Sequence, residues 1–253
     1  MFYMKIIKLD AINSTNEYLK ELLKNKSIKK NYIVYSYNQT NGKGQRGNVW
    51  YSEPDKNLAF SLSLLSPKVN LKNQFIINVI ISLFIIDFLD YFKIPDLSIK
   101  WPNDIMSGNK KICGILNEIQ LKKKHMESII IGLGININQE NFNNLPNASS
   151  LKLITKKNYD LNNFTNILIK KLKKNNFFVP FFSNTETLNQ KNLISSYNNK
   201  LYCRKKLKSF KLSNGKIFHG NIESVDINGI LNVKEKNHSL LRSFNGNEIQ
   251  III

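Results

Sequence analysis

The longest apolar run of the chain, Phe75–Phe92, places the first constraint on what the chain can fold into. Polar residues interrupt this run only at Asn78, Ser82, Asp87 and Asp90. A helix that crosses a membrane needs about 20 nearly uninterrupted apolar residues, so we interpret the run as a buried helix. With 42% hydrophobic residues, the chain has enough apolar material to pack around that helix as a globular protein.

Segments with strand character lie on both sides of this predicted helix. The expected strands cover residues 32–37, 58–65, 97–101, 111–121 and 128–138. Further helices are expected from Ser14 onward, where Ser14 and Glu17 have the spacing of a capping box, and over residues 161–172 and 185–197. This mixture predicts an α+β domain over residues 1–198.

A change in composition near residue 198 marks a second, smaller domain over residues 199–253. Its short alternating segments are separated by the pairs Asn214-Gly215, Asn228-Gly229 and Asn245-Gly246. Such pairs supply the positive φ angles that tight hairpins require. We therefore predict a small β-barrel here, and a chain of 253 residues has room for two unequal domains.

The chain carries a formal net charge of +19, which raises the question of nucleic acid. Its basic residues are mostly scattered lysines that accompany an excess of Asn and Ile, and no DNA-reading element is visible. We expect no specific DNA binding. Two cysteines without paired spacing indicate a reducing compartment, and Met1–Asp10 lacks the apolar core of a secretory signal, so we expect a cytoplasmic protein without a membrane segment.

Residues 42–47, with the sequence GKGQRG, are the first candidate for chemistry. Glycine lets a backbone approach a phosphate closely, while Lys43 and Arg46 neutralise charge. The segment fits neither the P-loop pattern nor the dinucleotide-binding pattern. Taken alone, it is equally compatible with an ordinary surface loop.

Five sequence blocks occur together with this segment, in a fixed order. They are Ser14–Asn16, Gln39–Trp50, Lys100–Asp104 (KWPND), Lys111–Leu116 (KICGIL) and Gly132–Asn138 (GLGININ). In this order and at these separations they resemble the biotin-protein ligases over nearly the whole chain. The resemblance implies a mixed-sheet catalytic domain of the biotin/lipoate ligase type, followed by a small SH3-like β-barrel.

The resemblance also implies a reaction. Biotin and ATP would form biotinyl-5'-AMP, and the biotinyl group would pass to a lysine of a biotin carboxyl carrier protein, part of acetyl-CoA carboxylase or of another biotin-dependent carboxylase. Mg²⁺ would bridge the ATP phosphates, with protein ligands that the sequence does not identify. Whether the protein is a monomer or a homodimer stays open.

Site residues follow from the same blocks. The resemblance assigns biotin binding to Ser14, Thr15, Asn16, Gln39, Gly42, Lys43, Lys111 and Gly114. It assigns the nucleotide to Gly44, Gln45, Arg46, Trp50, Asn103 and Asn136, and catalysis to Lys111, Arg46 and Asp104. A carboxylate that attacks a phosphate brings two anions together, so the site needs fixed cations, with Lys111 as the first choice.

Two departures from the commoner family pattern concern the glycine-rich segment. Lys43 and Gln45 stand where arginines are usual, and a lysine keeps the charge but loses the forked donor geometry. Retention of the adenylate is the property that this places in doubt. We expect the segment to be mobile without ligand and to close with Arg46 as its main clamp.

Plainer interpretations remain for several residues. Ser14 can act only as a helix cap, and Trp101 and Pro102 can serve only to end a strand. Cys113 is expected to be a packing residue, because the three histidines form no recurring arrangement with it. Only 13 residues precede Ser14, so we expect no helix-turn-helix domain. The competing functions are a lipoate-protein ligase and a non-enzymatic nucleic-acid-binding protein.

Overall fold

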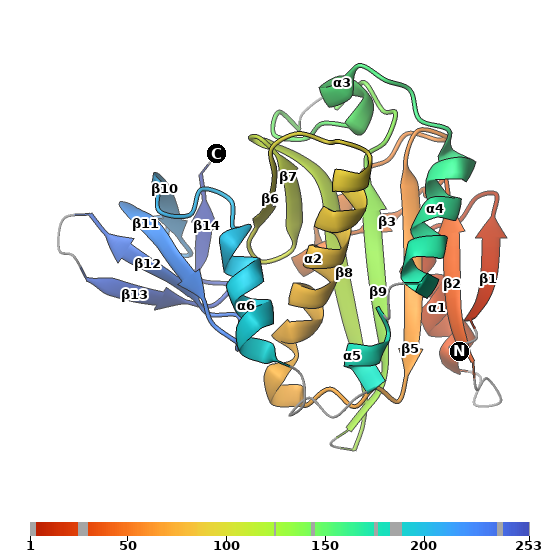
Figure 1. Cartoon of the computed structure of the whole chain (residues 1–253), viewed down its shortest axis with the longest axis horizontal. Helices are drawn as coiled ribbons and strands as arrows, with labels where there is room; N and C mark the ends of the chain where they lie inside the picture. Colours follow the sequence, from red (N-terminus) through yellow and green to blue (C-terminus); the bar gives the residue numbers. More distant parts are fainter. Residues whose placement is uncertain are drawn as a thin grey trace.

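The computed structural model describes residues 4–24, 30–123, 125–142, 145–174, 177–182, 189–236 and 240–252. Its larger sheet has seven strands in the order β1-β2-β5-β9-β8-β7-β6 (Figure 1). These strands are β1 (Met4–Leu9), β2 (Asn31–Ser36), β5 (Leu58–Leu65), β6 (Leu97–Lys100), β7 (Asp104–Ser107), β8 (Lys110–Lys122) and β9 (His125–Ile135). All five predicted strands of this region are confirmed.

This sheet is mixed, as the predicted fold class requires. β1 pairs with β2 in parallel, and every other pair is antiparallel. Sequence analysis did not predict β1 and β7. Both are short and carry polar or charged residues, and β7 follows a tight turn directly, so neither has a clear apolar pattern.

Helices cover both faces of the larger sheet. The apolar helix α2 (Phe75–Tyr91) and the helix α4 (Leu161–Lys174) pack on one face, in the same core as Ile33 and Ile131. The helix α1 (Thr15–Lys24) places Leu19 against Val34 and Ile130, which point to the opposite face. No helix in the described ranges is long and apolar enough to span a membrane, in agreement with the interpretation of residues 75–92 as a core helix.

The remaining helices are short. They are α3 (Leu151–Thr155), α5 (Val179–Phe182), α6 (Gln190–Asn199) and the 3₁₀ helices η1 (Gln45–Gly47) and η2 (Leu71–Asn73). The predicted helix over residues 161–172 is confirmed as α4. Of the predicted helix over residues 185–197, the part from 185 to 188 lies outside the described residues, and the rest is α6.

The smaller sheet is antiparallel, with the order β13-β12-β11-β10-β14. Its strands are β10 (Leu207–Leu212), β11 (Ile217–Val225), β12 (Leu231–Glu235), β13 (Leu241–Phe244) and β14 (Ile249–Ile251). Gly215 and Gly229 have the predicted positive φ, whereas Gly246 does not. The expectation for Gly246 was therefore wrong. An SH3-like closure and a boundary at residue 198 stay predictions.

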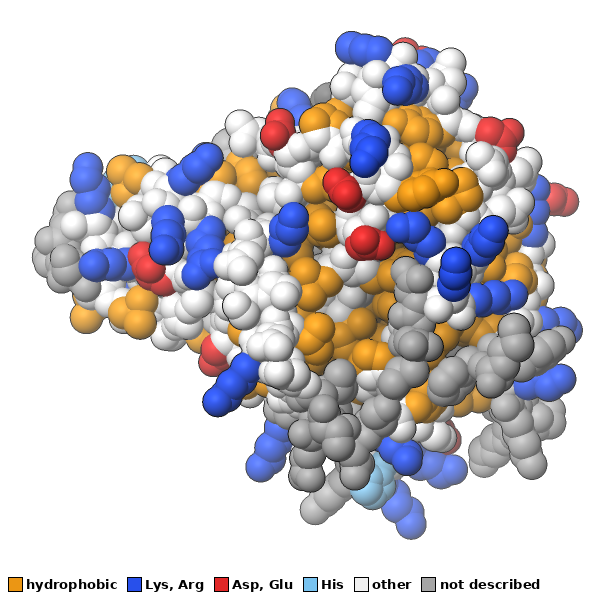
Figure 2. All heavy atoms as spheres, viewed as in Figure 1, with side chains coloured by type: hydrophobic (Ala, Val, Ile, Leu, Met, Phe, Trp, Pro, Cys, Tyr) orange, Lys and Arg blue, Asp and Glu red, His pale blue; other side chains and the backbone are white. Residues whose placement is uncertain are grey.

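Contacts between the two sheets pass through a few buried groups. The Trp101 indole Nε1 donates a hydrogen bond to the carbonyl oxygen of Gly229 at 3.0 Å. On α6, Asn198 accepts from the Val225 N–H at 2.7 Å and donates to the Val225 carbonyl at 3.0 Å. In Figure 2 the lysine and arginine side chains are spread over the visible face and do not gather into one stripe.

We predict that Asn198→Ala destabilises the protein. The substitution leaves both the N–H and the carbonyl of the buried Val225 without the partner that Asn198 supplies, which costs roughly 2–4 kcal/mol for two buried groups. Urea unfolding of both proteins measures the difference. The control is Asn199→Ala, since Asn199 is exposed, and an equal effect of the two substitutions would contradict the prediction.

Candidate functional site

A cavity of about 430 Å³ opens between the larger sheet, the segment over residues 42–50 and the end of the smaller sheet. We call it the first pocket. Thirteen of the predicted site residues line it: Ser14, Thr15, Asn16, Gln39, Lys43, Gly44, Gln45, Arg46, Trp50, Asn103, Asp104, Lys111 and Gly114. The sequence blocks that are far apart in the chain therefore meet in one place.

A second cavity of about 250 Å³ adjoins the first. This second pocket contains Asn136 and shares Trp50, Lys100, Asp104 and Lys111 with the first pocket. Gly42 lines neither pocket. Its lack of a side chain leaves room for two residues that do line the first pocket. A Cβ at position 42 would lie 2.4 Å from the Trp50 carbonyl oxygen and 2.6 Å from the Gln39 Nε2.

The start of α1 forms one wall of the first pocket. Ser14 caps the helix, with its Oγ accepting from the Glu17 N–H at 3.4 Å. The Thr15 N–H and hydroxyl both donate to the Gln39 Oε1, at 3.0 and 3.3 Å. The Gln39 carbonyl oxygen is engaged twice, and within the described residues no hydrogen bond engages the Gln39 NH₂ group, which can donate to a ligand.

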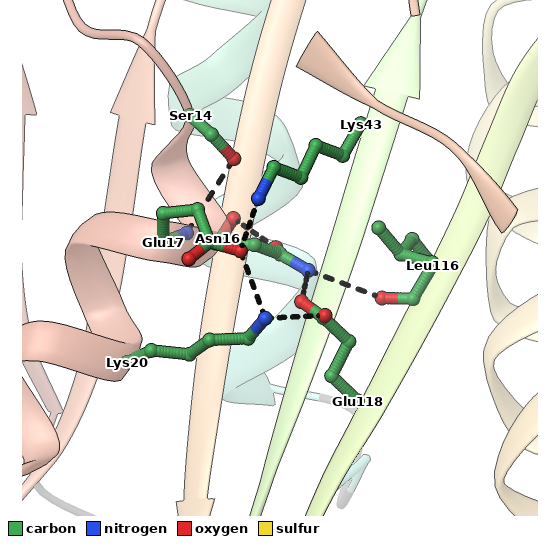
Figure 3. Close-up of polar contacts among 8 residues, drawn as sticks. Ser14, Asn16, Glu17, Lys20, Lys43, Leu116 and Glu118 are labelled. Atoms are coloured by element: carbon green, nitrogen blue, oxygen red, sulfur yellow. Dashed lines mark hydrogen bonds and ion pairs between the residues drawn. The ribbon is translucent and has the colours of Figure 1, made fainter. Parts of the chain in front are cut away.

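Asn16 is fixed by a charged network beside this wall (Figure 3). Its Nδ2 donates to the Glu118 carboxylate at 2.7 Å, and its Oδ1 lies 2.6 Å from the Ser61 hydroxyl. Lys20 bridges Glu118 at 2.5 Å and Glu17 at 2.8 Å. Sequence analysis missed Lys20 and Glu118, since only the fold brings β8 against α1.

The same network binds Lys43, one of the two cations of the glycine-rich segment. Lys43 forms an ion pair with Glu17 at 3.0 Å. The hydrogen bonds from Lys20 and then from Lys43 lower the pKa of Glu17. Burial by itself lowers the pKa of Lys20. The hydrogen bonds to Glu118 and Glu17 outweigh burial, so the pKa of Lys20 is raised. The Glu17 carboxylate thus binds two lysines, and among the described contacts only the serine half of the predicted capping box is formed.

The glycine-rich segment is a narrow hairpin between two-residue strands. β3 (Gly42–Lys43) pairs with β4 (Val49–Trp50), and η1 lies between them. Arg46 has a φ of 60°, in the left-handed region. Its guanidinium lies so close to Gly246 of the smaller sheet that a Cβ at position 246 would be 2.7 Å from Nη2. Movement of the hairpin on ligand binding stays a prediction.

Trp50 lines both pockets. Its indole ring lies directly over Gly114 of β8 and Gly134 of β9, which are paired across the sheet. A Cβ would be 2.7 Å from the ring at position 114 and 2.3 Å at position 134. The two glycines therefore create the space in which the ring lies.

A cluster of charges lies where the two pockets meet. The Lys111 Nζ is 2.7 Å from the Asp104 Oδ1 and 5.2 Å from the centre of the Trp50 ring. Asp104 begins strand β7, directly after the turn over residues 101–103. Lys100 at the end of β6 faces both pockets and was not assigned from the sequence.

Asn103 and Asn136 of the site differ in how their side-chain amide groups are hydrogen-bonded. The Asn103 Nδ2 donates to the Ile115 carbonyl at 2.8 Å, which holds the turn before β7. The Asn136 Nδ2 donates to the Ser149 carbonyl at 3.0 Å, while the Asn136 Oδ1 is buried without a partner in the described structure. A buried acceptor without a partner is costly, so the Oδ1 is available to a donor from a ligand in the second pocket.

The plainer interpretation agrees with the position of Cys113, whereas Trp101 does more than end a strand. Trp101 is buried and anchors the smaller sheet through Gly229, although it also lines the first pocket. Cys113 is buried in the core, and burial raises the pKa of its thiol far above the usual range, which keeps it protonated. The described residues contain no group of three His, Cys, Asp or Glu side chains that could hold a metal ion.

Known sequences resemble this chain over its first half. A model of the biotin/lipoate A/B protein ligase family matches residues 9–136. The bifunctional ligase/repressor BirA of Bacillus spizizenii is 33% identical over 135 residues, which cover 53% of this chain and 41% of that protein. The biotin--[acetyl-CoA-carboxylase] ligase of Paracoccus denitrificans is 30% identical over 106 residues, which cover 41% of this chain and 43% of that protein. The chain thus matches about two fifths of the length of these relatives.

Similarity to a solved structure extends over the whole chain. The biotin protein ligase from Aquifex aeolicus, in complex with biotin and ATP, has a TM-score of 0.76 with 24% sequence identity. The match covers 98% of both chains and therefore includes both sheets. It shows that the chain has the fold of that ligase.

We predict that Gly134→Ala displaces the Trp50 ring, because the added methyl group would lie 2.3 Å from it. The chain has two tryptophans, Trp50 and Trp101, so intrinsic fluorescence reports the change. The emission should shift in Gly134→Ala and not when the same substitution is made in a Trp50→Phe background. An unchanged emission in the first variant would show that the ring does not rest on this strand.

Proposed function

Because the chain belongs to the biotin/lipoate A/B protein ligase family, we propose that it is a biotin-protein ligase. It activates biotin with ATP to biotinyl-5'-AMP and transfers the biotinyl group to a lysine of a biotin carboxyl carrier protein. One observation carries this proposal: two pockets of different chemistry meet at the Lys111–Asp104 pair, and Trp50 lines both of them. A reaction that joins two substrates requires such a junction.

The first pocket suits biotin. The ureido ring of biotin carries one carbonyl acceptor and two N–H donors, and the wall formed by Ser14, Thr15 and Gln39 offers hydroxyls and an amide. At the other end of the pocket, Lys111 is placed to receive the biotin carboxylate. Asn16, Gly42 and Gly114 shape the wall and floor, and Lys43 adds a cation to the rim.

The second pocket suits the adenosine part of ATP. The unpartnered Asn136 Oδ1 can accept from an adenine amino group, and the Trp50 ring offers a face for stacking. Asn103, Gly44, Gln45 and Arg46 line the neighbouring first pocket, on the side where the hairpin meets the smaller sheet. The assignment of these four residues to the nucleotide comes from the sequence and stays a prediction, because they line the first pocket and not the second.

The first step joins two anions. Lys111 neutralises the biotin carboxylate and the α-phosphate as the carboxylate oxygen attacks phosphorus and pyrophosphate leaves. In the second step the acceptor lysine attacks the biotinyl carbonyl carbon and AMP leaves. Asp104 is the one carboxylate among the described residues that line either pocket, so it is the candidate to take the proton from the acceptor amine.

Magnesium is expected to enter with the ATP phosphates. The described residues offer no set of three His, Cys, Asp or Glu side chains for a metal ion, so no step of the mechanism is assigned to a protein-held metal. We further propose a cytoplasmic location, since the expected acceptors are carboxylases, and an enzyme that acts without specific DNA binding.

The activity test uses the purified protein with biotin, MgATP and a biotin carboxyl carrier domain. We expect ATP-dependent labelling of one acceptor lysine, detected by mass spectrometry. Labelling with lipoate in place of biotin would favour the lipoate-protein ligases of the same family. Stabilisation by an oligonucleotide at physiological salt, without labelling, would favour the nucleic-acid-binding alternative.

Lys111→Ala should slow adenylate formation by roughly a hundredfold or more, because one preorganised charge-stabilising group is lost. Biotin-dependent pyrophosphate release measures this rate. The matched control is Lys110→Ala, which removes an exposed lysine whose ammonium bonds only the Pro146 carbonyl in the described structure. If Lys111→Ala released pyrophosphate as fast as the control, the assigned role of Lys111 would be wrong.

A further inference from the structure

A second lysine lies at the junction of the two pockets. Lys100 ends strand β6 and pairs in register with Asp104 of β7, while its neighbour Ile99 points into the core on the opposite face. Its side chain is half-buried and lines both pockets, together with Lys111 and Trp50.

The cations of the site differ in whether a carboxylate already binds them. Lys43 is paired with Glu17, and Lys111 with Asp104. Arg46 lies against the Gly246 backbone. Within the described part of the chain, the Lys100 ammonium forms no ion pair and no hydrogen bond.

The carboxylate near Lys100 is that of Asp104, which is already bound directly by Lys111. Burial lowers the pKa of the Lys100 ammonium group; the nearby Asp104 carboxylate opposes this shift and the Lys111 charge adds to it. Holding a cation in such a place is unfavourable until an anion arrives. An anionic ligand at this position regains the lost stabilisation.

We propose that Lys100 is a catalytic residue that binds the β- and γ-phosphates of ATP and receives pyrophosphate as it leaves. This inference rests on the proposed function. A biotin carboxylate oxygen forms a bond to the α-phosphorus, the bond from that phosphorus to the bridging oxygen breaks, and pyrophosphate keeps its electron pair. Lys111 stabilises the attacking side of this exchange, and Lys100 stabilises the leaving side.

Lys100 and Lys111 are therefore expected to differ in the half-reactions that they affect. Pyrophosphate has left before the acceptor lysine attacks, so Lys100 contributes to adenylate formation and not to transfer. Lys111 and Asp104 remain beside the adenylate through both steps. A role of Lys100 in folding alone would affect the two steps equally.

The test compares Lys100→Met and Lys100→Arg with the wild type. The control is Lys68→Met, because Lys68 is exposed and lies in neither pocket. Three quantities are measured: kcat/KM for ATP in biotin-dependent pyrophosphate release, transfer to the carrier domain from supplied biotinyl-AMP, and the affinity of the protein for inorganic pyrophosphate. Thermal unfolding checks that each variant is folded.

We expect Lys100→Met to lower kcat/KM for ATP by roughly a hundredfold and to weaken pyrophosphate binding by about tenfold or more, while transfer from supplied adenylate stays within about twofold of the wild type. Lys100→Arg, which keeps the charge, should recover most of the first two quantities. Unchanged kcat/KM, or an equal loss in both half-reactions, would overturn the proposal.

Failure of the proposed function would look different. A wild-type protein that releases no pyrophosphate with biotin contradicts the ligase activity, whatever the variants do. The affinity for inorganic pyrophosphate then still decides the role of Lys100 as an anion-binding residue. Equal affinity in the wild type and Lys100→Met would refute that role as well.

Discussion

The architecture of the site depends on the contact between the Trp50 ring and the backbone of the larger sheet. Strands β8 and β9 bring Gly114 and Gly134 side by side, and the ring rests on this pair at distances that leave no room for a side chain. The contact fixes the end of the β3–β4 hairpin to the sheet. The ring also lines both pockets, together with Lys100, Asp104 and Lys111.

Charge organises the space above that ring. A site that brings two anionic substrates together needs cations, but cations confined without ligands repel one another and lose hydration. The structure meets this difficulty by pairing Lys43 with Glu17 and Lys111 with Asp104. Under the proposed function, substrate anions would exchange with these carboxylates. Lys100 alone among these three lysines forms no ion pair in the described residues.

The smaller sheet is part of the site. Gly246, Ile249, Gln250 and Ile251 complete the wall of the first pocket. The Arg46 guanidinium of the hairpin lies close to Gly246 in this wall. The Trp101–Gly229 hydrogen bond and the Asn198–Val225 pair hold this sheet against the larger one. These hydrogen bonds therefore help to position one wall of the first pocket.

The sequence by itself determined the strongly patterned elements and the residue types of the site. The apolar run that became α2, the alternating strands β5, β8 and β9, and the five blocks were visible because periodicity and local motifs are properties of neighbouring residues. Only the tertiary structure decided which distant side chains pair. Lys20 and Glu118 lie almost a hundred positions apart and meet only when α1 packs beside β8. The same holds for Arg46 with Gly246, for the unpartnered Asn136 Oδ1 and for Lys100. Pairing, burial and the absence of a partner are set by the surroundings that folding supplies, and no local pattern in the chain encodes them.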